Sequence, residues 1–591
     1  MPSKIISQML RLPLMAGAVA FSAFLLIAQA DAQADLSEPP LSETIAESTL
    51  AGSYLAAQIA SKDNDDKNAV AFYERAISLD PDNTDLKHAL FLALASNGQV
   101  SEAVEIGRKL PQKGAQGSVI RLVLAVEALR QKSWSQVIDL MNEPTGGGDL
   151  DRIIREILTA WAEFGSGDPE NALKDVRKIE GPDWVKVVGN YHAGLIAAAT
   201  GNDTEAEKLL QAATENELAA AVLSETYLRA LEALIRTQSR LGKTDEAHKS
   251  LEKGLKLLSN HPPFLALAKL LDEGKPLAPL VASAQQGGAE LFYNVGSAIS
   301  RQGGAPFAQN YLQLAEYLDP GSDAIVIGLA NVFENQKNHE RANSYYERIS
   351  KQSPYWRSAQ LEYALNLNDL KKVDEAKAIL SKLVEEDPND LISEMTLGAV
   401  LSQHEEYPQA AKVYDTAVER LGEPQAIDWK LFYRRGIAYE RLKEWNKAEP
   451  NFKQALELSP NQPDVLNYLG YSWIDMGIHL DEGMDMIRKA VELKPRSGFI
   501  VDSLGWAYYR LGKYDDAVRE LERAVDLMPE DPVVNDHLGD AYWKVGRKLE
   551  ATFQWNHALV FKPEPADEAK IQEKLKNGLV EKGPATADSS Q

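Results

Sequence analysis

The sequence predicts an all-α solenoid, in which one helix–turn–helix unit recurs about every 34 residues. Three observations lead to this prediction. Pro320, Pro354 and Pro388 are 34 residues apart, and small residues recur at two fixed positions of the same period. The period itself holds over the whole second half of the chain. Because proline cannot lie inside a helix, it marks the end of the second helix of each unit.

Eight periods are clear when slot 1 is placed at Ala289, Asp323, Arg357, Leu391, Trp429, Pro463, Gly498 and Pro532. Slot 8 is then always small: Gly296, Ala330, Ala364, Gly398, Gly436, Gly470, Gly505 and Gly539. Slot 20 is alanine in seven periods: Ala308, Ala342, Ala376, Ala410, Ala448, Ala517 and Ala551. The longer period from Pro463 has Glu482 there, and Gly483 takes the place if the extra residue lies in the turn. Small residues at both slots let the two helices pack closely, with large residues at slots 7, 11 and 24 around the contact.

The first half of the chain carries a decayed form of the same pattern. Periods that begin at Leu50, Thr84, Ile153, Val187 and Leu228 supply Ala69, Ala103, Ala172, Ala206 and Ala247 at slot 20. Two further helix pairs, near 117–149 and 262–288, have the length but not the residues. The total is about 13 to 15 repeats. We interpret Gly146-Gly147-Gly148 and Gly287-Gly288 as turns, with hinges as the alternative.

This pattern resembles the tetratricopeptide repeat (TPR), which has small residues at slots 8, 20 and 27 and proline at slot 32. The resemblance implies a right-handed superhelix whose first helices line a concave groove, with slots 2, 5, 9, 12 and 13 pointing into it. An amphipathic helix at 566–580 should cap the last repeat, because a solenoid must shield the apolar face of its final unit.

The first thirty residues look like an export signal. Lys4 and Arg11 precede a 16-residue apolar stretch, and three overlapping A-x-A patterns follow from Ala28. This order is typical of a cleaved secretory signal peptide, and 16 residues is short for the alternative, an uncleaved membrane anchor. We therefore expect a periplasmic protein with no transmembrane segment after cleavage. The predicted organisation is signal peptide 1–30, linker 31–49, degenerate array 50–288, regular array 289–565, capping helix 566–580 and disordered tail 581–591.

Composition and motifs argue against several classes of function. The net charge of −24 disfavours nucleic acid as a partner. The absence of cysteine excludes disulfides, thiol catalysis, cysteine-bound zinc and a lipoprotein form. Gly242-Lys243-Thr244 resembles the end of a phosphate-binding loop, but Thr237 stands where the earlier glycine is required. We therefore predict no enzyme activity, no cofactor and no metal site.

The last four repeats concentrate aromatic, Asn and Asp side chains at the groove slots. Rings supply contact area at low entropy cost, and the polar groups can bond a peptide backbone. The acidic chain should favour a segment that carries cations around an apolar anchor. The predicted partner-binding groove consists of Asn467, Tyr471, Phe499, Asp502, Trp506, Tyr509, Asp536, Asp540 and Trp543.

The sequence from 429 to 565 also resembles the closing repeats of large exported bacterial TPR proteins. The words that carry this resemblance are Asn467-Tyr468-Leu469-Gly470-Tyr471, Asp502-Ser503-Leu504-Gly505-Trp506 and His537-Leu538-Gly539-Asp540. Some of those proteins are lipoprotein adaptors that deliver cell-wall hydrolases to a periplasmic carboxyl-terminal processing protease, although this chain lacks their lipid-bearing cysteine. The resemblance implies a protein-binding scaffold or adaptor. The alternatives are a structural part of an export or polysaccharide-secretion assembly and, from another class, a TPR-fused transferase.

Overall fold

A computed structural model describes residues 45–112, 114–142, 148–215 and 221–579. These residues are helical and contain no strand. They fall into two compact units, one within 28–376 and one within 377–591, which we call the N-terminal and C-terminal units. The predicted signal peptide, most of the predicted linker and the predicted tail lie outside the described residues. No helix in the described part of the chain combines the length and apolar character that a membrane span requires.

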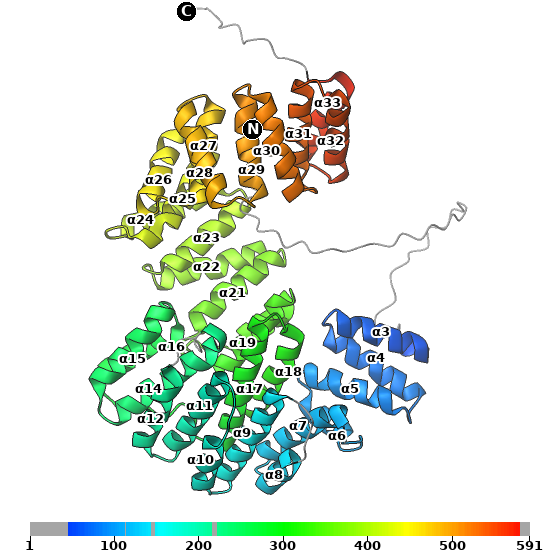
Figure 1. The fold of residues 1–591 in the computed structure, drawn as a ribbon, viewed down its shortest axis with the longest axis vertical. Helices are drawn as coiled ribbons and strands as arrows, with labels where there is room; N and C mark the ends of the chain where they lie inside the picture. The colour runs from blue at the N-terminus through cyan, green and yellow to red at the C-terminus, as the bar shows by residue number, and fades with distance from the viewer. Residues whose placement is uncertain (1–44, 113, 143–147, 216–220, 580–591) are drawn as a thin grey trace, which may run out of the picture. The chain divides into compact units, whose positions relative to one another are not determined.

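The N-terminal unit consists of successive antiparallel helix pairs (Figure 1). These are α3 (Leu50–Lys62) with α4 (Asp66–Leu79), α5 (Thr84–Ser96) with α6 (Val100–Gly107), α7 (Gly114–Arg130) with α8 (Trp134–Asn142), α9 (Asp149–Gly165) with α10 (Pro169–Arg177), α11 (Asp183–Ala199) with α12 (Asp203–Thr214), α14 (Ser224–Arg240) with α15 (Thr244–Leu257), α17 (Ala284–Arg301) with α18 (Ala305–Leu318), and α19 (Asp323–Asn335) with α20 (His339–Tyr346). Helix α21 (Trp356–Asp369) follows, and the division between the units falls inside α22 (Val373–Glu386).

The C-terminal unit continues the pattern up to a single closing helix. Its first helices pack on one another in order, α27 on α29 and α29 on α31, as a solenoid requires. Its elements are α23 (Leu391–Gln403), α24 (Tyr407–Arg420), the 3₁₀ turn η1 (Ala426–Asp428), α25 (Trp429–Arg441), α26 (Trp445–Leu458), α27 (Pro463–Met476), α28 (Leu480–Leu493), α29 (Gly498–Arg510), α30 (Tyr514–Leu527), α31 (Pro532–Lys544), α32 (Lys548–Val560) and α33 (Pro565–Asn577). Within the described residues the N-terminal unit by itself forms eight helix pairs and the C-terminal unit by itself forms five, and this total of thirteen lies inside the predicted range.

The slot assignment is confirmed by the packing. The alanines at slot 20, from Ala69 to Ala551, are completely buried. A Cβ atom added to Gly505 would lie 2.6 Å from Cγ of Leu521, the slot 24 residue of the same repeat. In the longer repeat, Gly470 and Gly483 face each other directly, since a Cβ on Gly470 would lie 2.6 Å from the carbonyl oxygen of Gly483. The extra residue lies in the turn after Met476, as expected.

Two predictions for the first half are wrong. The region 262–288 is not a helix pair: α16 (Pro262–Asp272) stands alone, and an extended segment leads from it to α17. Gly287 and Gly288 form neither a turn nor a hinge, because both are buried inside α17. The boundary predicted at residue 288 therefore falls within a continuous helix. The expectation for Gly146 and Gly147 lies outside the described residues.

Helix α17 packs against the first helices of four earlier repeats, α7, α9, α11 and α14. A Cβ on Gly287 would lie 2.1 Å from the indole ring of Trp161, so only glycine permits this approach. Nε1 of the fully buried Trp161 donates a hydrogen bond to Nδ1 of His192, at 3.1 Å. Because α17 contacts all four helices, it covers much of the surface that they form, which we call the first-helix face.

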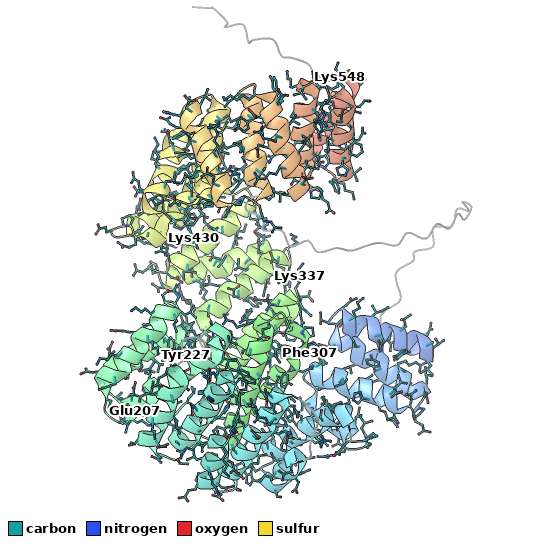
Figure 2. All side chains as sticks on the ribbon, viewed as in Figure 1. Glu207, Tyr227, Phe307, Lys337, Lys430 and Lys548 are labelled. Atoms are coloured by element: carbon teal, nitrogen blue, oxygen red, sulfur yellow. The ribbon has the colours of Figure 1, made fainter. Side chains whose placement is uncertain are left out.

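Two side chains of this unit are labelled in Figure 2. Tyr227 of α14 is buried, and Phe307 of α18 is largely exposed.

Helix α18 extends this covering to the beginning of the array. It packs against α5, α6 and α7. Nε2 of Gln309 donates to the Asp66 carboxylate at 2.5 Å and to the Ser96 carbonyl at 2.8 Å. The Tyr317 hydroxyl donates to Glu127 at 2.7 Å. The pair α17–α18 therefore packs across the repeats that precede it, with α17 on their first helices and α18 on first and second helices of the earliest repeats.

Candidate functional site

The nine groove residues predicted in the C-terminal unit divide into two groups by burial. Asn467, Tyr471, Asp502 and Asp540 are buried and take part in the packing of the repeats. Asn467, for example, donates to the Ser503 hydroxyl at 3.2 Å, between successive first helices. The other five are half-buried: Phe499, Trp506, Tyr509, Asp536 and Trp543. Their role in binding a partner stays a prediction.

Trp506 belongs to a stack of rings between α29 and α31. Its indole lies 4.0 Å from the ring of His537 and 4.6 Å from that of Tyr509, with both pairs nearly parallel. The other side of His537 is fixed by Asp502, whose carboxylate lies 3.0 Å from Nδ1. Burial lowers the pKa of His537, but the charge and hydrogen bond of Asp502 outweigh it and raise this pKa above its ordinary value. The predicted ring surface thus includes His537, which the groove slots did not contain.

The residues predicted at the end of the groove contact the capping helix α33. Nζ of Lys574 lies 2.8 Å from Asp536 and 2.7 Å from Asp540. Asp540 also accepts from Nε1 of the buried Trp555, at 3.0 Å. Burial and the charge of Asp536 raise the pKa of Asp540 to about 6, although Lys574 acts in the opposite direction. Gly578 closes over Trp543, since a Cβ there would lie 2.3 Å from its indole. These three groove positions are therefore used within the chain.

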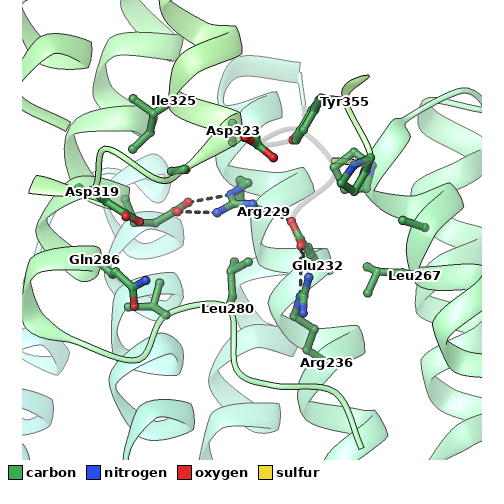
Figure 3. Close-up of a pocket in the computed structure, with 18 of the residues that line it drawn as sticks. Arg229, Glu232, Arg236, Leu267, Leu280, Gln286, Asp319, Asp323, Ile325 and Tyr355 are labelled. Carbon is green, nitrogen blue, oxygen red and sulfur yellow. Dashed lines mark hydrogen bonds and ion pairs between the residues drawn. The ribbon is translucent and has the colours of Figure 1, made fainter. Parts of the chain in front are cut away.

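The N-terminal unit has an open site on its first-helix face, where α14, α17 and α19 meet the lone helix α16. A pocket of about 300 Å³ lies there, between Arg229, Glu232 and Arg236 of α14, Asp323 of α19 and the ring of Tyr355 (Figure 3). Tyr355 precedes α21 and also lines a second pocket of about 330 Å³. The two pockets thus meet at one half-buried aromatic ring.

A buried ion network forms the wall of the first pocket. Arg229 bonds Glu290 of α17 through Nε at 3.0 Å and through Nη2 at 2.7 Å, and its Nη1 bonds Glu232 at 2.7 Å. Arg236 bonds Glu232 from the other side, at 2.8 Å. Burial raises the pKa of Glu290, but the charge and hydrogen bonds of Arg229 outweigh it and hold this pKa below its ordinary value. The positive charges of the two arginines equal the negative charges of the two glutamates. The excess negative charge among the residues that line the pocket therefore comes from Asp319 and Asp323.

The lining of the second pocket includes hydroxyl and amide groups together with two charged side chains, Glu225 and Arg301. Ser297 and Ser300 lie on α17, and Asn331 and Asn335 on α19. Within the described residues, the side chains of Ser297, Ser300 and Asn335 make no hydrogen bond. Nδ1 of His261, which also lines this pocket, is buried and has no partner in the described part of the chain. The pocket therefore offers donors and acceptors that the fold itself does not use.

The slot rule would have found this site. Arg229, Glu232 and Arg236 occupy slots 2, 5 and 9 of the repeat that begins at Leu228, and Asn331 and Asn335 occupy slots 9 and 13 of the repeat from Asp323. The prediction was restricted to the last four repeats because aromatic residues concentrate there. It missed Tyr355, which lies in a connection and has no slot.

Within residues 45–579 as described, no cluster of three or more His, Asp or Glu side chains has an arrangement that could hold a metal ion. Lys243 lies in the turn between α14 and α15 and forms an ion pair with Glu207. The turn between the two helices and the ion pair of Lys243 therefore account for the residues at 242–244.

Models of the tetratricopeptide repeat match the chain at four places. They cover residues 52–83, 358–390 and 429–462, and a further TPR repeat model covers 505–546. The match at 52–83 lies in the N-terminal unit, those at 429–462 and 505–546 lie in the C-terminal unit, and the match at 358–390 includes residues of both.

Known proteins share this repeat with the chain. It is 30% identical to TPR repeat-containing protein PA4667 of Pseudomonas aeruginosa over 200 residues. These residues make up 34% of this chain and 33% of that protein. Over 94 residues it is 31% identical to BBSome complex member BBS4 of Bos taurus, 16% of this chain and 18% of that protein. The chain thus aligns with a third or less of these relatives. A solved structure, the APC/C hetero-tetramer Cut9-Hcn1, aligns with 91% of this chain and 98% of that chain at 15% identity, with a TM-score of 0.38.

Proposed function

Because the chain is a tetratricopeptide-repeat protein, and such repeats form protein-interaction scaffolds, we propose that it holds an extended protein segment in the two pockets that meet at Tyr355. The observation that carries the proposal is the set of unused polar groups at groove slots, Ser297, Ser300 and Asn335, beside a half-buried ring. Hydroxyl and amide groups bond a peptide backbone, and an aromatic ring supplies an apolar contact at low entropy cost.

The ion network beside the pockets supports a preformed site. Arg229 and Glu290 are fixed by paired hydrogen bonds, so the wall of the first pocket need not order itself when a segment binds. Asp319 and Asp323 give that pocket its excess negative charge, which favours a segment with a Lys or Arg side chain at this point.

The proposal extends to the place of action and the biological role. The charge-poor apolar start and the A-x-A patterns from Ala28 support export to the periplasm. The resemblance of 429–565 to exported adaptors supports a non-enzymatic role in delivering substrates, such as cell-wall hydrolases, to a carboxyl-terminal processing protease. A part in an export or polysaccharide-secretion assembly is the alternative, since it needs the same groove, and a TPR-fused transferase is the rival from another class.

The absence of cysteine makes a site-specific test available. Ser297→Cys places one thiol in the second pocket, and Ser344→Cys places one on the exposed surface of α20, the second helix of the next repeat. Each variant carries a photo-cross-linker and is exposed to the envelope fraction of its host. Adducts should form at position 297 and not at 344, and they should be lost when Asn335→Ala is added.

The identity of the adducts separates the roles. A protease together with a cell-wall hydrolase supports the adaptor, and secretion components support the alternative. Equal labelling from both positions, or none from either, would reject the pockets as a partner site. The intact mass of the same preparation tests export, because the mature N-terminus should lie between Asp31 and Asp35.

A further inference from the structure

Helix α33 and the residue that follows it, Gly578, lie on three residues at groove slots of α31, which we call the α33 seat: Asp536, Asp540 and Trp543. The helix meets the seat through Lys574, whose Nζ donates to both carboxylates. Ile571, three residues earlier and 1% exposed, joins the core of the C-terminal unit. An aliphatic side chain followed by a cation is the chemistry that an acidic groove with apolar floor selects.

The attachment of α33 rests on few contacts. Of its thirteen residues only Ile571 is buried. Leu575 and Leu579 pack partly against the core, and the other basic residue of its last turn, Lys576, is exposed. Helices with few buried apolar contacts open locally more readily than the units they cover.

The seat also has more negative charge than α33 neutralises. The two carboxylates of the seat, Asp536 and Asp540, share one lysine, Lys574, and the carboxylate of Asp502 next to the seat bonds His537. Even with His537 protonated, one negative charge remains. An arginine fork, which can bond two carboxylate groups at once, would satisfy Asp536 and Asp540 better than a single ammonium group does.

We infer that the α33 seat is a binding site for a partner helix that carries an aliphatic residue and, three positions later, an arginine or lysine, and that α33 is the intramolecular competitor of that helix. The site is independent of the pockets around Tyr355. A partner that binds the seat displaces α33, so the segment after Pro563 becomes accessible when the seat is engaged.

Charge reversal at two neighbouring positions of α33 tests the competition in the full chain. Lys574→Glu removes the contact with the seat, and Lys576→Glu makes the same change on the exposed side of the same turn. Hydrogen exchange of the α33 amides should rise at least tenfold in Lys574→Glu and stay at the wild-type rate in Lys576→Glu. Ile571→Ala should give the same rise through a different contact.

The probe for the opened seat is a fluorescent peptide with the sequence of residues 565–579. Lys574→Glu protein should bind it at least tenfold more tightly than wild type or Lys576→Glu, because the seat is then empty. Replacing the lysine that corresponds to 574 by arginine in the peptide should strengthen binding, and replacing it by alanine should abolish it.

Each other result overturns the inference. If α33 opens but the peptide binds no better, the seat is only a cap. If Lys574→Glu leaves exchange unchanged, the ion pairs do not hold the helix. If Lys574→Glu and Ile571→Ala both speed exchange through α31, then α33 is needed for the fold and cannot leave. If wild-type chains form concentration-dependent dimers that Lys574→Glu abolishes, the seat takes the α33 of a second copy instead.

Discussion

Buried polar side chains connect distant repeats of the N-terminal unit. Tyr191 on α11 and Arg229 on α14 both donate to Glu290 of α17, the first at 2.7 Å. Removing one member of such a set leaves the others buried and unpaired, which costs more than the net value of the bond. His192, beside Tyr191, differs because it holds its place as a neutral ring. Its Nδ1 accepts the hydrogen bond of Trp161.

Because His192 is buried as a neutral ring, we expect the free energy of unfolding of the N-terminal unit to fall in mild acid. Burial lowers the pKa of His192 to about 4, whereas the unfolded chain takes up the proton near pH 6.5. The unfolded state therefore binds more protons between these values, and stability falls as the pH drops from about 6.5 towards 4. The cost at pH 5 is about 2 kcal/mol at 1.36 kcal/mol per pH unit. Denaturant unfolding of the N-terminal unit at pH 7 and pH 5 measures it.

The matched variants are His192→Gln and His248→Gln, the latter at a half-exposed position of α15. His192→Gln should lower stability at pH 7 but flatten its pH dependence by about the predicted amount. His248→Gln should keep the wild-type dependence. An unchanged slope in His192→Gln would show that another group causes the acid loss.

At the scale of helices, local packing rules made most of the fold predictable. Slots 8, 20 and 24 concern contacts within one repeat, and so they follow from the sequence period. The burial of Leu504, Tyr508 and Trp555 was predicted on that basis. The covering of the first-helix face by α17 and α18 was not, because it joins residues hundreds of positions apart and has no period. For the same reason Gly287 was interpreted as a turn.

The candidate site was predictable in kind but not in place. The groove slots point to the pocket-lining residues of α14, α17 and α19 as well as to those of the last repeats. Two features outside the slots distinguish the two sets of residues. Helix α33 covers the slots of the last repeat, and Tyr355 lies beside the slots of α14, α17 and α19. Neither belongs to the repeat pattern.

The contact between slots 8 and 24 predicts a local cost in the C-terminal unit. Gly505→Ala places a Cβ 2.6 Å from Cγ of Leu521 and 3.1 Å from its backbone nitrogen, whereas Gly422→Ala meets nothing within 4 Å. Overpacking should cost about 1–3 kcal/mol, reduced by up to about 1 kcal/mol of helix propensity. Gly422→Ala should stay within about 0.5 kcal/mol of wild type. Hydrogen exchange across 498–531 reports the difference, and an unchanged rate in Gly505→Ala would contradict the slot assignment.

On the scale of the molecule, the two units should respond to damage differently. Repeats of a linear solenoid contact mainly their neighbours, and so a defect stays local at first. The N-terminal unit departs from this rule because α17 contacts α7, α9, α11 and α14 together. A defect at α17 should therefore spread over several repeats.

Gly287→Ala tests this cooperativity. Its Cβ would lie 2.1 Å from the indole of Trp161 on α9, which is fully buried and hydrogen-bonded to His192 of α11. The expected loss is about 1–3 kcal/mol or more, with exchange rising together in α9, α11 and α17. Residues 391–560 should keep the wild-type rates. Gly148→Ala, which meets open space, is the control. Faster exchange confined to α17 would mean that the N-terminal unit behaves as an ordinary solenoid.

The hydrogen bond between Gln309 and Asp66 can form only after a long interval of chain synthesis. Its two residues are 243 positions apart. At about 5–20 residues per second, on the order of 10–50 s pass between the emergence of Asp66 and that of Gln309. During this interval the apolar first helices from α5 to α14 have been made but lack the pair that covers them. The early repeats must therefore wait for a late segment, so a factor that shields apolar helices has its longest opportunity to act before α18 is complete.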